Sequence, residues 1–125
     1  MNDLRTPLKI VMIDDDELML DSTLSFLTDE GFITTGFTSP HYAMQSIKDN
    51  PPDICIIDYR IPDIDGEQLV LQIKQTSPGI RCLIYTGAAI TLTDAMRQHG
   101  ISESDIIQKP ITDFDIFISL LLHHR

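Results

Sequence analysis

Short apolar runs alternate with longer segments of mixed polarity along the chain. Apolar runs of about four to eight residues, bounded by polar or turn-forming residues, are typical of strands in a buried sheet. The third run is continuously apolar, which predicts that both of its faces are covered, whereas the second is more exposed. The five predicted strands are KIVMI (9–13), FITTGF (32–37), PPDICIID (51–58), RCLIYT (81–86) and DIIQ (105–108).

The segments between these runs carry apolar residues at helical spacing. The first places Leu20, Leu24 and Leu27 on one side of a helix that stops at Gly31. Ser39–Pro40 opens the second helix as its cap and first residue. Further helices are predicted after the loop YRIPDIDG (59–66) as far as Pro78–Gly79, within TLTDAMRQHG (91–100), and from Thr112, with Asp115 completing a capping box.

Strand and helix alternate five times, which predicts an α/β fold with a parallel sheet and helices on both faces. The 125 residues have the length of one domain, and no internal repeat or linker divides them. We therefore predict one domain over residues 1–125, with its folded core starting near residue 9, and leave open an output domain beyond residue 125. In such sheets ligands bind beyond the carboxyl ends of the strands, so these ends are where chemistry is expected.

Polar side chains stand at the ends of four predicted strands. Asp14 and Asp15 follow the first strand, Asp58 ends the third, Thr86 ends the fourth and Lys109 follows the fifth. Each has a simpler explanation by itself, such as a helix cap, a turn former or a solvated lysine. Because the carboxyl ends of parallel strands share one edge of the sheet, all of them would meet there. This coincidence favours a functional site.

Carboxylates at close range repel one another unless a cation holds them. Hard divalent cations such as Mg²⁺ prefer carboxylate, carbonyl and water oxygens, while the lack of His and Cys at these strand ends disfavours zinc or copper. An aspartate beside Mg²⁺, with a lysine and a hydroxyl nearby, can attack a phosphoryl group and hold it as an acyl phosphate. The sequence contains no glycine-rich phosphate-binding loop, so nucleotide binding is not indicated.

Composition restricts the partners of the chain. A net charge of −10 and a pI near 4.5 argue against direct nucleic-acid binding and against attachment to an anionic membrane. The sequence shows no signal peptide and no run of transmembrane length, so we expect a cytoplasmic location. Cys55 and Cys82 lie in predicted strands without the spacing of metal ligands, and we interpret them as small buried side chains.

Four motifs, taken in order, resemble the receiver domain of two-component response regulators. They are IDDD (13–16), IIDYRIPDIDG (56–66), YTG (85–87) and KP (109–110). The resemblance extends from about Lys9 to the C-terminus, and only D-x-x-x-P-D-x-D-G is distinctive by itself. It implies a flavodoxin-like, doubly wound sheet of five strands in the order 2-1-3-4-5.

The resemblance also implies roles for the acidic residues. Asp58 would accept a phosphoryl group from the phosphohistidine of a sensor histidine kinase or phosphotransfer protein. Asp15 would bind Mg²⁺ directly and Asp14 would assist through water, while Asp58 and the main-chain carbonyl of Arg60 would be further ligands. Asp16, the last of the acidic run, is interpreted as the cap of the following helix.

Three residues complete the site that the resemblance implies. Lys109 would pair with the phosphoryl group, Thr86 would be the switch hydroxyl that moves toward it, and Gly87 would leave room for it. Members of the family often carry an aromatic ring before the lysine, which turns inward when the hydroxyl moves. Here residues 106–108 are IIQ, so that ring is absent.

Arg60 stands two residues beyond the expected phosphoacceptor. We hypothesise that its side chain points toward the carboxyl edge of the sheet, where it would hinder or orient attacking water and so set the lifetime of the acyl phosphate. A solvated arginine is the alternative.

The final segment, TDFDIFISLLLHHR (112–125), is apolar around much of the predicted helix. A helix of this kind requires burial on more than one side. An extended core is one explanation. A homodimer or a contact with an output domain, through the last two helices, is the other.

We expect a signalling domain switched by Mg²⁺-dependent phosphorylation of Asp58, which catalyses only its own phosphorylation and dephosphorylation and is not otherwise an enzyme. The missing aromatic favours one alternative, a phosphorylation-independent interaction module with the same fold. A Mg²⁺-dependent phosphohydrolase is the other. Against it, Arg60 occupies the position at which a hydrolase would need a general acid.

Overall fold

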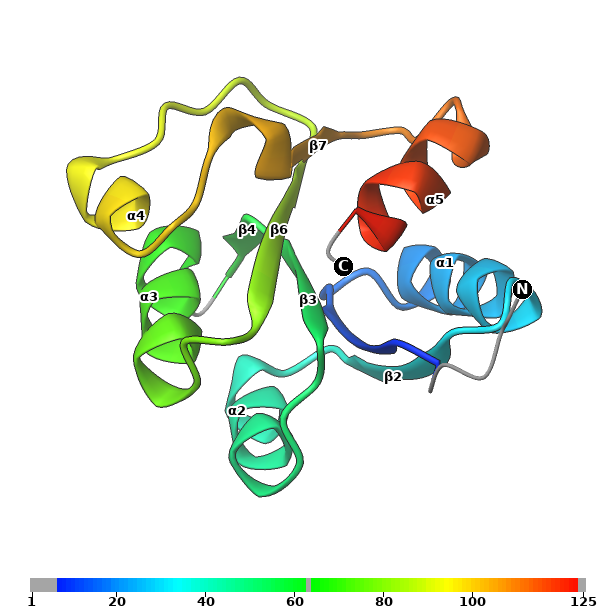
Figure 1. Ribbon diagram of the computed structural model, residues 1–125, viewed down its shortest axis with the longest axis horizontal. Helices are drawn as coiled ribbons and strands as arrows, with labels where there is room; N and C mark the ends of the chain where they lie inside the picture. Colours follow the sequence, from blue (N-terminus) through cyan, green and yellow to red (C-terminus); the bar gives the residue numbers. More distant parts are fainter. Residues whose placement is uncertain (1–6, 63, 124–125) are drawn as a thin grey trace.

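The computed structural model describes residues 7–62 and 64–123, in which a parallel sheet of five strands carries helices on both faces (Figure 1). Counted along this sheet alone, the strand order is 2-1-3-4-5, and the predicted doubly wound fold is confirmed. β2 and β7 form the two edges. From edge to edge the strands are β2 (Ile33–Phe37), β1 (Lys9–Ile13), β3 (Ile54–Asp58), β6 (Arg81–Thr86) and β7 (Ile106–Gln108).

Each α-helix begins after a polar residue whose side chain accepts a hydrogen bond from an N–H of the first turn. These first N–H groups have no partner within the helix, so the caps stabilise the helix starts. The helices are α1 (Glu17–Asp29), α2 (Pro40–Asp49), α3 (Gly66–Thr76), α4 (Asp94–Gln98) and α5 (Phe114–Leu122), and a short 3₁₀ turn, η1 (Glu103–Asp105), precedes β7. The caps are Asp16, Ser39, Asp65, Thr93 and Asp113.

Two local predictions were wrong. The last helix is not capped by Thr112, because the carboxylate of Asp113 accepts a hydrogen bond from the Ile116 N–H at 3.1 Å and starts α5 one residue later. The segment 59–66 is not only a loop, since β4 (Arg60–Ile61) and β5 (Ile64–Asp65) pair as a small antiparallel ribbon. Strands of two residues are too short to show any alternation in the sequence.

Alternating side chains along the strands divide the core into two layers, one on each face of the sheet. Figure 1 shows α2, α3 and α4 on one side of the sheet and α1 and α5 on the other. Helices α2, α3 and α4 cover the layer that contains Ile57 and Ile84. Helices α1 and α5 cover the other layer, which contains Ile56 and Tyr85. β3 lies in the middle of the sheet and is buried along its whole length, as its continuous apolar run predicts.

The two cysteines lie opposite one another on neighbouring strands. Cys55 of β3 is the register partner of Cys82 of β6, and both are free and buried. Their side chains belong to the layer under α2, α3 and α4. The interpretation of both as small buried side chains is confirmed.

The apolar helix α5 is only partly buried. Phe117 and Leu121 belong to the core, and Phe114 contacts Phe26 of α1 with the ring centroids 4.6 Å apart. By contrast, Ile116 and Leu122 are 66% and 51% exposed. The core thus accounts for one face of α5, and the outer face remains available for a contact with another molecule or domain.

Gly66 starts α3 in close contact with Tyr59. A Cβ at this position would lie 2.6 Å from the Tyr59 carbonyl oxygen and 2.6 Å from its ring Cδ1. We expect Gly66→Ala to lower the free energy of unfolding by about 2 kcal/mol, because backbone must shift to accept the methyl group. The matched control Gly79→Ala, whose Cβ would meet nothing within 4 Å, should change this free energy by less than about 0.5 kcal/mol. Urea unfolding measures both, and equal effects would contradict the contact.

Candidate functional site

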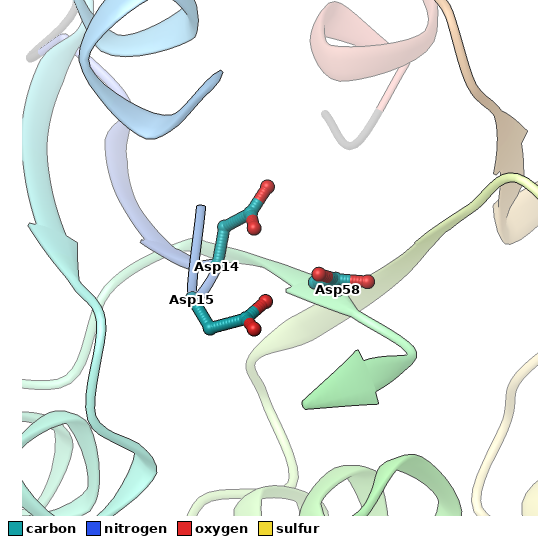
Figure 2. A group of neighbouring side chains, drawn as sticks. All are labelled: Asp14, Asp15 and Asp58. Atoms are coloured by element: carbon teal, nitrogen blue, oxygen red, sulfur yellow. The ribbon is translucent and has the colours of Figure 1, made fainter. Parts of the chain in front are cut away.

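The carboxyl edge of the sheet gathers three carboxylates. Asp14 and Asp15 follow β1 and Asp58 ends β3, so two adjacent strands bring them together. One carboxylate oxygen of each lies within 4.8 Å of the others. Figure 2 shows the three side chains around a common space, with Asp14 and Asp15 on one side and Asp58 on the other.

Asp14 is fully buried. Its Oδ1 accepts a hydrogen bond from the Asp16 N–H at 2.9 Å, while its Oδ2 has no hydrogen-bond partner among the residues that the structure describes. Burial raises the pKa of Asp14 from 3.8 to about 6. The Asp16 N–H and the charge of Lys109 oppose this rise, and the charge of Asp58 adds to it. Asp14 is therefore a carboxylate that lacks a full set of partners.

Lys109, which follows β7, is the cation of the site. Its Nζ lies 3.4 Å from Asp58 Oδ2 and 3.8 Å from Asp14 Oδ2. Its backbone N–H donates to the Thr86 carbonyl at 2.9 Å, which continues the pairing of β6 with β7. Lys109 thus faces two of the three carboxylates.

Asp58 is buried at the end of β3, and the turn after it is fixed by its own side chain. Its Oδ1 accepts a hydrogen bond from the Arg60 N–H at 3.1 Å. The next residue, Tyr59, donates its N–H to the Tyr85 carbonyl at 3.1 Å. The backbone of Arg60 is therefore held beside Asp58, whereas its side chain is exposed.

Thr86 is buried at the end of β6, with its hydroxyl bonded to the backbone of Ala88. The Ala88 N–H donates to Thr86 Oγ1 at 3.1 Å, and the hydroxyl donates back to the Ala88 carbonyl at 3.3 Å. These bonds engage the hydroxyl in the loop, not with the carboxylates. Next to it, Gly87 is exposed, and a Cβ there would meet only Lys109 Cβ at 3.9 Å.

Tyr85 is a residue of the site that the sequence interpretation treated only as part of a strand. Lys109 Nζ lies 4.7 Å from the centroid of its ring, and its hydroxyl donates to Met19 Sδ at 3.4 Å. Burial raises the pKa of the Tyr85 phenol, and the charges of Asp14 and Asp58 raise it further. The sequence did contain a signal for this place: Tyr85 is the last residue before Thr86 at the strand end, and alternation along a strand points its side chain to the opposite face from that of Thr86.

The donor set suits a hard divalent cation. Three carboxylates converge, and one of their oxygens, Asp14 Oδ2, is buried without a hydrogen bond among the described residues. Mg²⁺ is usually bound by one or two carboxylates together with water and phosphate oxygens. A cation here would also relieve the repulsion between the carboxylates and offset the cost of burying the Asp14 charge.

The fold and the site together define a class of protein: a doubly wound α/β domain with a cluster of carboxylates and one lysine at the carboxyl edge of its sheet. The family model for the response regulator receiver domain matches residues 10–120. The chain belongs to this family, and is a receiver domain of the kind found in two-component response regulators.

Relatives and solved structures agree with this assignment. The regulatory protein VanRc of Enterococcus gallinarum is 31% identical over 108 residues, which cover 86% of this chain and 46% of that protein. The transcriptional regulatory protein BasR of Escherichia coli (strain K12) is 29% identical over 103 residues, 82% of this chain and 46% of that protein. The chain thus spans about half the length of these curated relatives.

The fold also agrees with a solved structure. A CheY-like receiver domain protein from Methanospirillum hungatei JF-1 superposes with a TM-score of 0.82 at 23% identity, covering 95% of this chain and 94% of that one. Within residues 7–62 and 64–123, none of the helices has the length and apolar character that crossing a membrane requires.

Proposed function

We propose that this receiver domain is a phosphoacceptor, switched by Mg²⁺-dependent transfer of a phosphoryl group to Asp58 from the phosphohistidine of a sensor kinase or phosphotransfer protein. One observation carries the proposal: the Lys109 ammonium lies 3.4 Å from Asp58 Oδ2, beside a cluster of three carboxylates. A nucleophilic carboxylate, a cation for the phosphoryl oxygens and a metal site are the parts that this reaction needs.

Asp14, Asp15, Asp58 and the main-chain carbonyl of Arg60 would hold the metal. When bound, Mg²⁺ neutralises charge on the phosphoryl oxygens and orients them for in-line attack. The convergence of the three carboxylates supports this ligand set. So does the hydrogen bond from the Arg60 N–H to Asp58, which keeps that stretch of backbone beside the site.

The residues of the chain have separate parts in the transfer. A carboxylate oxygen of Asp58 attacks phosphorus, the new O–P bond forms, and the P–N bond to the donor imidazole breaks. Lys109 then pairs with a phosphoryl oxygen in place of the Asp58 carboxylate. For Thr86 to reach that group, its hydroxyl must leave the Ala88 backbone, and this exchange of partners is the proposed switch.

Intact mass spectrometry tests the proposal. The protein is incubated with Mg²⁺ and a small phosphodonor such as acetyl phosphate, and a mass gain of one phosphoryl group is expected. Chelation of Mg²⁺ should abolish the gain, and hydroxylamine should remove the label because it cleaves acyl phosphates. A protein that takes no label under these conditions would overturn the proposal.

The same experiment separates two other functions. An interaction module that works without phosphorylation is favoured by one observation, the Ile106–Gln108 strand with no aromatic residue before Lys109. It predicts no label under any condition. A Mg²⁺-dependent phosphohydrolase predicts many turnovers of a phosphoester and little accumulated label.

Receiver domains act in signalling and are not enzymes in the usual sense. We propose that this chain is a single domain over residues 1–125 that catalyses only its own phosphorylation and dephosphorylation, in the cytoplasm.

We further propose that the outer face of α5, with Ile116 and Leu122 exposed, meets a second copy or an output domain together with α4. A net charge of −10 supports the absence of direct contact with nucleic acid or membrane.

Arg60 is expected to control the lifetime of the acyl phosphate. Its backbone N–H bonds Asp58, and its side chain is exposed to solvent. We expect the label of Arg60→Ala to hydrolyse about threefold faster or slower than that of the parent, because the side chain hinders or orients attacking water. Loss of label followed by mass measures this rate, with Arg97→Ala on α4 as a control. Indistinguishable rates would refute the role.

A further inference from the structure

Tyr85 occupies an unusual place beside the proposed phosphoryl site. It lies next to Asp58 in the sheet, since the two residues are register partners on β6 and β3. Its side chain is 2% exposed and belongs to the layer that α1 and α5 cover. A phenol ring is therefore packed directly against the strand end that carries the proposed phosphoacceptor.

The ring contacts the cation of the site. Lys109 Nζ lies 4.7 Å from the ring centroid, within the range of a cation–π interaction. Its distances to the two carboxylates, 3.4 Å and 3.8 Å, are longer than charge-assisted hydrogen bonds, which are about 2.7–2.9 Å. The carboxylates alone therefore do not fix the ammonium by short hydrogen bonds, and the ring supplies a third contact.

The ring itself is held from its far end. The Tyr85 hydroxyl donates to Met19 Sδ at 3.4 Å, and Met19 lies in the first turn of α1, three residues after Asp16. Burial of the ring and this hydrogen bond leave it little freedom to rotate. Tyr85 is thus a rigid support between α1 and the lysine.

Lysine needs such a support more than the other residues of the site. Its ammonium ends a flexible chain of four methylene groups and is strongly hydrated, so it readily turns toward water. Here the Lys109 side chain is 23% exposed and follows a strand of only three residues at the edge of the sheet. The ring therefore adds a contact on one side of the ammonium, opposite in kind to the hydration that draws it into solvent.

We propose that Tyr85 is a positioning residue for the phosphoryl site: its ring holds the Lys109 ammonium against Asp58, and its hydroxyl anchors the ring to α1 through Met19. The consequence for the transfer rests on the function proposed above. The position of the lysine does not, because it is a property of the unphosphorylated domain.

A magnetic resonance experiment tests the position alone. The chain has four lysines, so ¹³C labelling at lysine Cε gives few signals, and Lys109→Arg assigns the signal of interest. An aromatic ring next to the ammonium shifts the Lys109 ε-methylene protons upfield. We expect this shift in the parent and in Tyr85→Phe, and its loss in Tyr85→Leu. An unshifted Lys109 signal in the parent would overturn the proposal, whether or not the protein can be phosphorylated.

Labelling rates with acetyl phosphate and Mg²⁺ then test the effect on the reaction. We expect Tyr85→Leu to be about fivefold slower than the parent, the loss expected from one partly desolvated cation–π contact. Tyr85→Phe, which keeps the ring, should recover most of that loss. Tyr42→Leu makes the same change at an exposed position on α2 and should label at the parental rate.

A purely structural role gives a different pattern. Urea unfolding shows whether each variant is folded under the labelling conditions, and rates are compared per folded molecule. In the Lys109→Met background, Tyr85→Leu and Tyr85→Phe should differ less than in the parent, since no cation remains for the ring to position. Equal slowing by Phe and Leu, or the same Leu effect in both backgrounds, would overturn the proposal. A parent that takes no label would refute the phosphoacceptor function, while the resonance of Lys109 would still decide the role of Tyr85.

Discussion

Replacing Asp58 with Asn should reduce labelling by a small phosphodonor at least about hundredfold, because an amide cannot act as the nucleophile that the carboxylate provides. The two side chains have nearly the same size, so the packing at the end of β3 is retained. The amide oxygen can still accept the hydrogen bond that the Arg60 N–H now donates to Asp58 Oδ1. The variant therefore loses the nucleophilic carboxylate and keeps the fold.

The rate is measured by intact mass in saturating Mg²⁺. Asp21→Asn makes the same substitution at an exposed position on α1 and should label like the parent. Label that persists in Asp58→Asn would place the acceptor at another residue and refute the assignment of Asp58. Label lost equally in Asp21→Asn would point to an effect of charge on the whole domain.

The second large effect concerns the stability of the domain as a function of pH. The pKa of Asp14 is raised from 3.8 to about 6 in the folded state, chiefly by burial. Asp14 therefore holds its proton more tightly in the folded domain than in the unfolded chain. The stabilisation from this proton is fully present below about pH 4 and is lost as the pH rises through about 6. Over this interval the loss corresponds to about 3 kcal/mol of unfolding free energy.

Asp14→Asn should remove this dependence. In the absence of Mg²⁺, we expect the variant to match the parent in unfolding free energy near pH 4 and to exceed it at pH 7.5 by about 3 kcal/mol, the loss given above. Added Mg²⁺ should stabilise the parent at pH 7.5 much more than the variant, because it neutralises the carboxylate that burial disfavours. Urea unfolding at the two pH values measures this, with Asp21→Asn as the control. A parent whose stability does not change between pH 4 and 7.5 relative to Asp14→Asn would contradict the effect of burial.

The parts of the fold that were predicted correctly depend on long, repeated signals. Five alternations of strand and helix determine a parallel sheet, and the sheet in turn brings the ends of β1 and β3 together. The sequence alone therefore groups Asp14, Asp15 and Asp58, and their roles stay proposals. Helix caps such as Asp16 and Ser39 were also correctly predicted, because a cap depends on a few neighbouring residues only.

The parts that were missed depend on contacts between distant segments or on choices between similar neighbours. Whether Thr112 or Asp113 caps α5 is decided by small differences in backbone geometry and in the strength of the acceptor. The sequence could not identify Ala88 as the backbone partner of the Thr86 hydroxyl, because that bond depends on the path of the loop after β6, and the role of Thr86 as a switch stays a prediction. Tyr85 meets Met19, 66 residues earlier, and Lys109 only because three elements converge on one layer.

The two buried cysteines allow the opening of the core to be followed as a rate of thiol modification. Burial raises the pKa of the Cys82 thiol to about 12 and that of Cys55 well above its ordinary value, so neither forms the reactive thiolate in the folded domain. Because their side chains lie in the layer under α2, α3 and α4, a thiol reagent can reach them only when these helices move away from the sheet or the domain unfolds. The rate of thiol modification therefore reports how often the face of β3 and β6 under these helices becomes exposed. Measured with and without a phosphoryl group on the domain, it would give the kinetic effect of the switch on the scaffold that holds it.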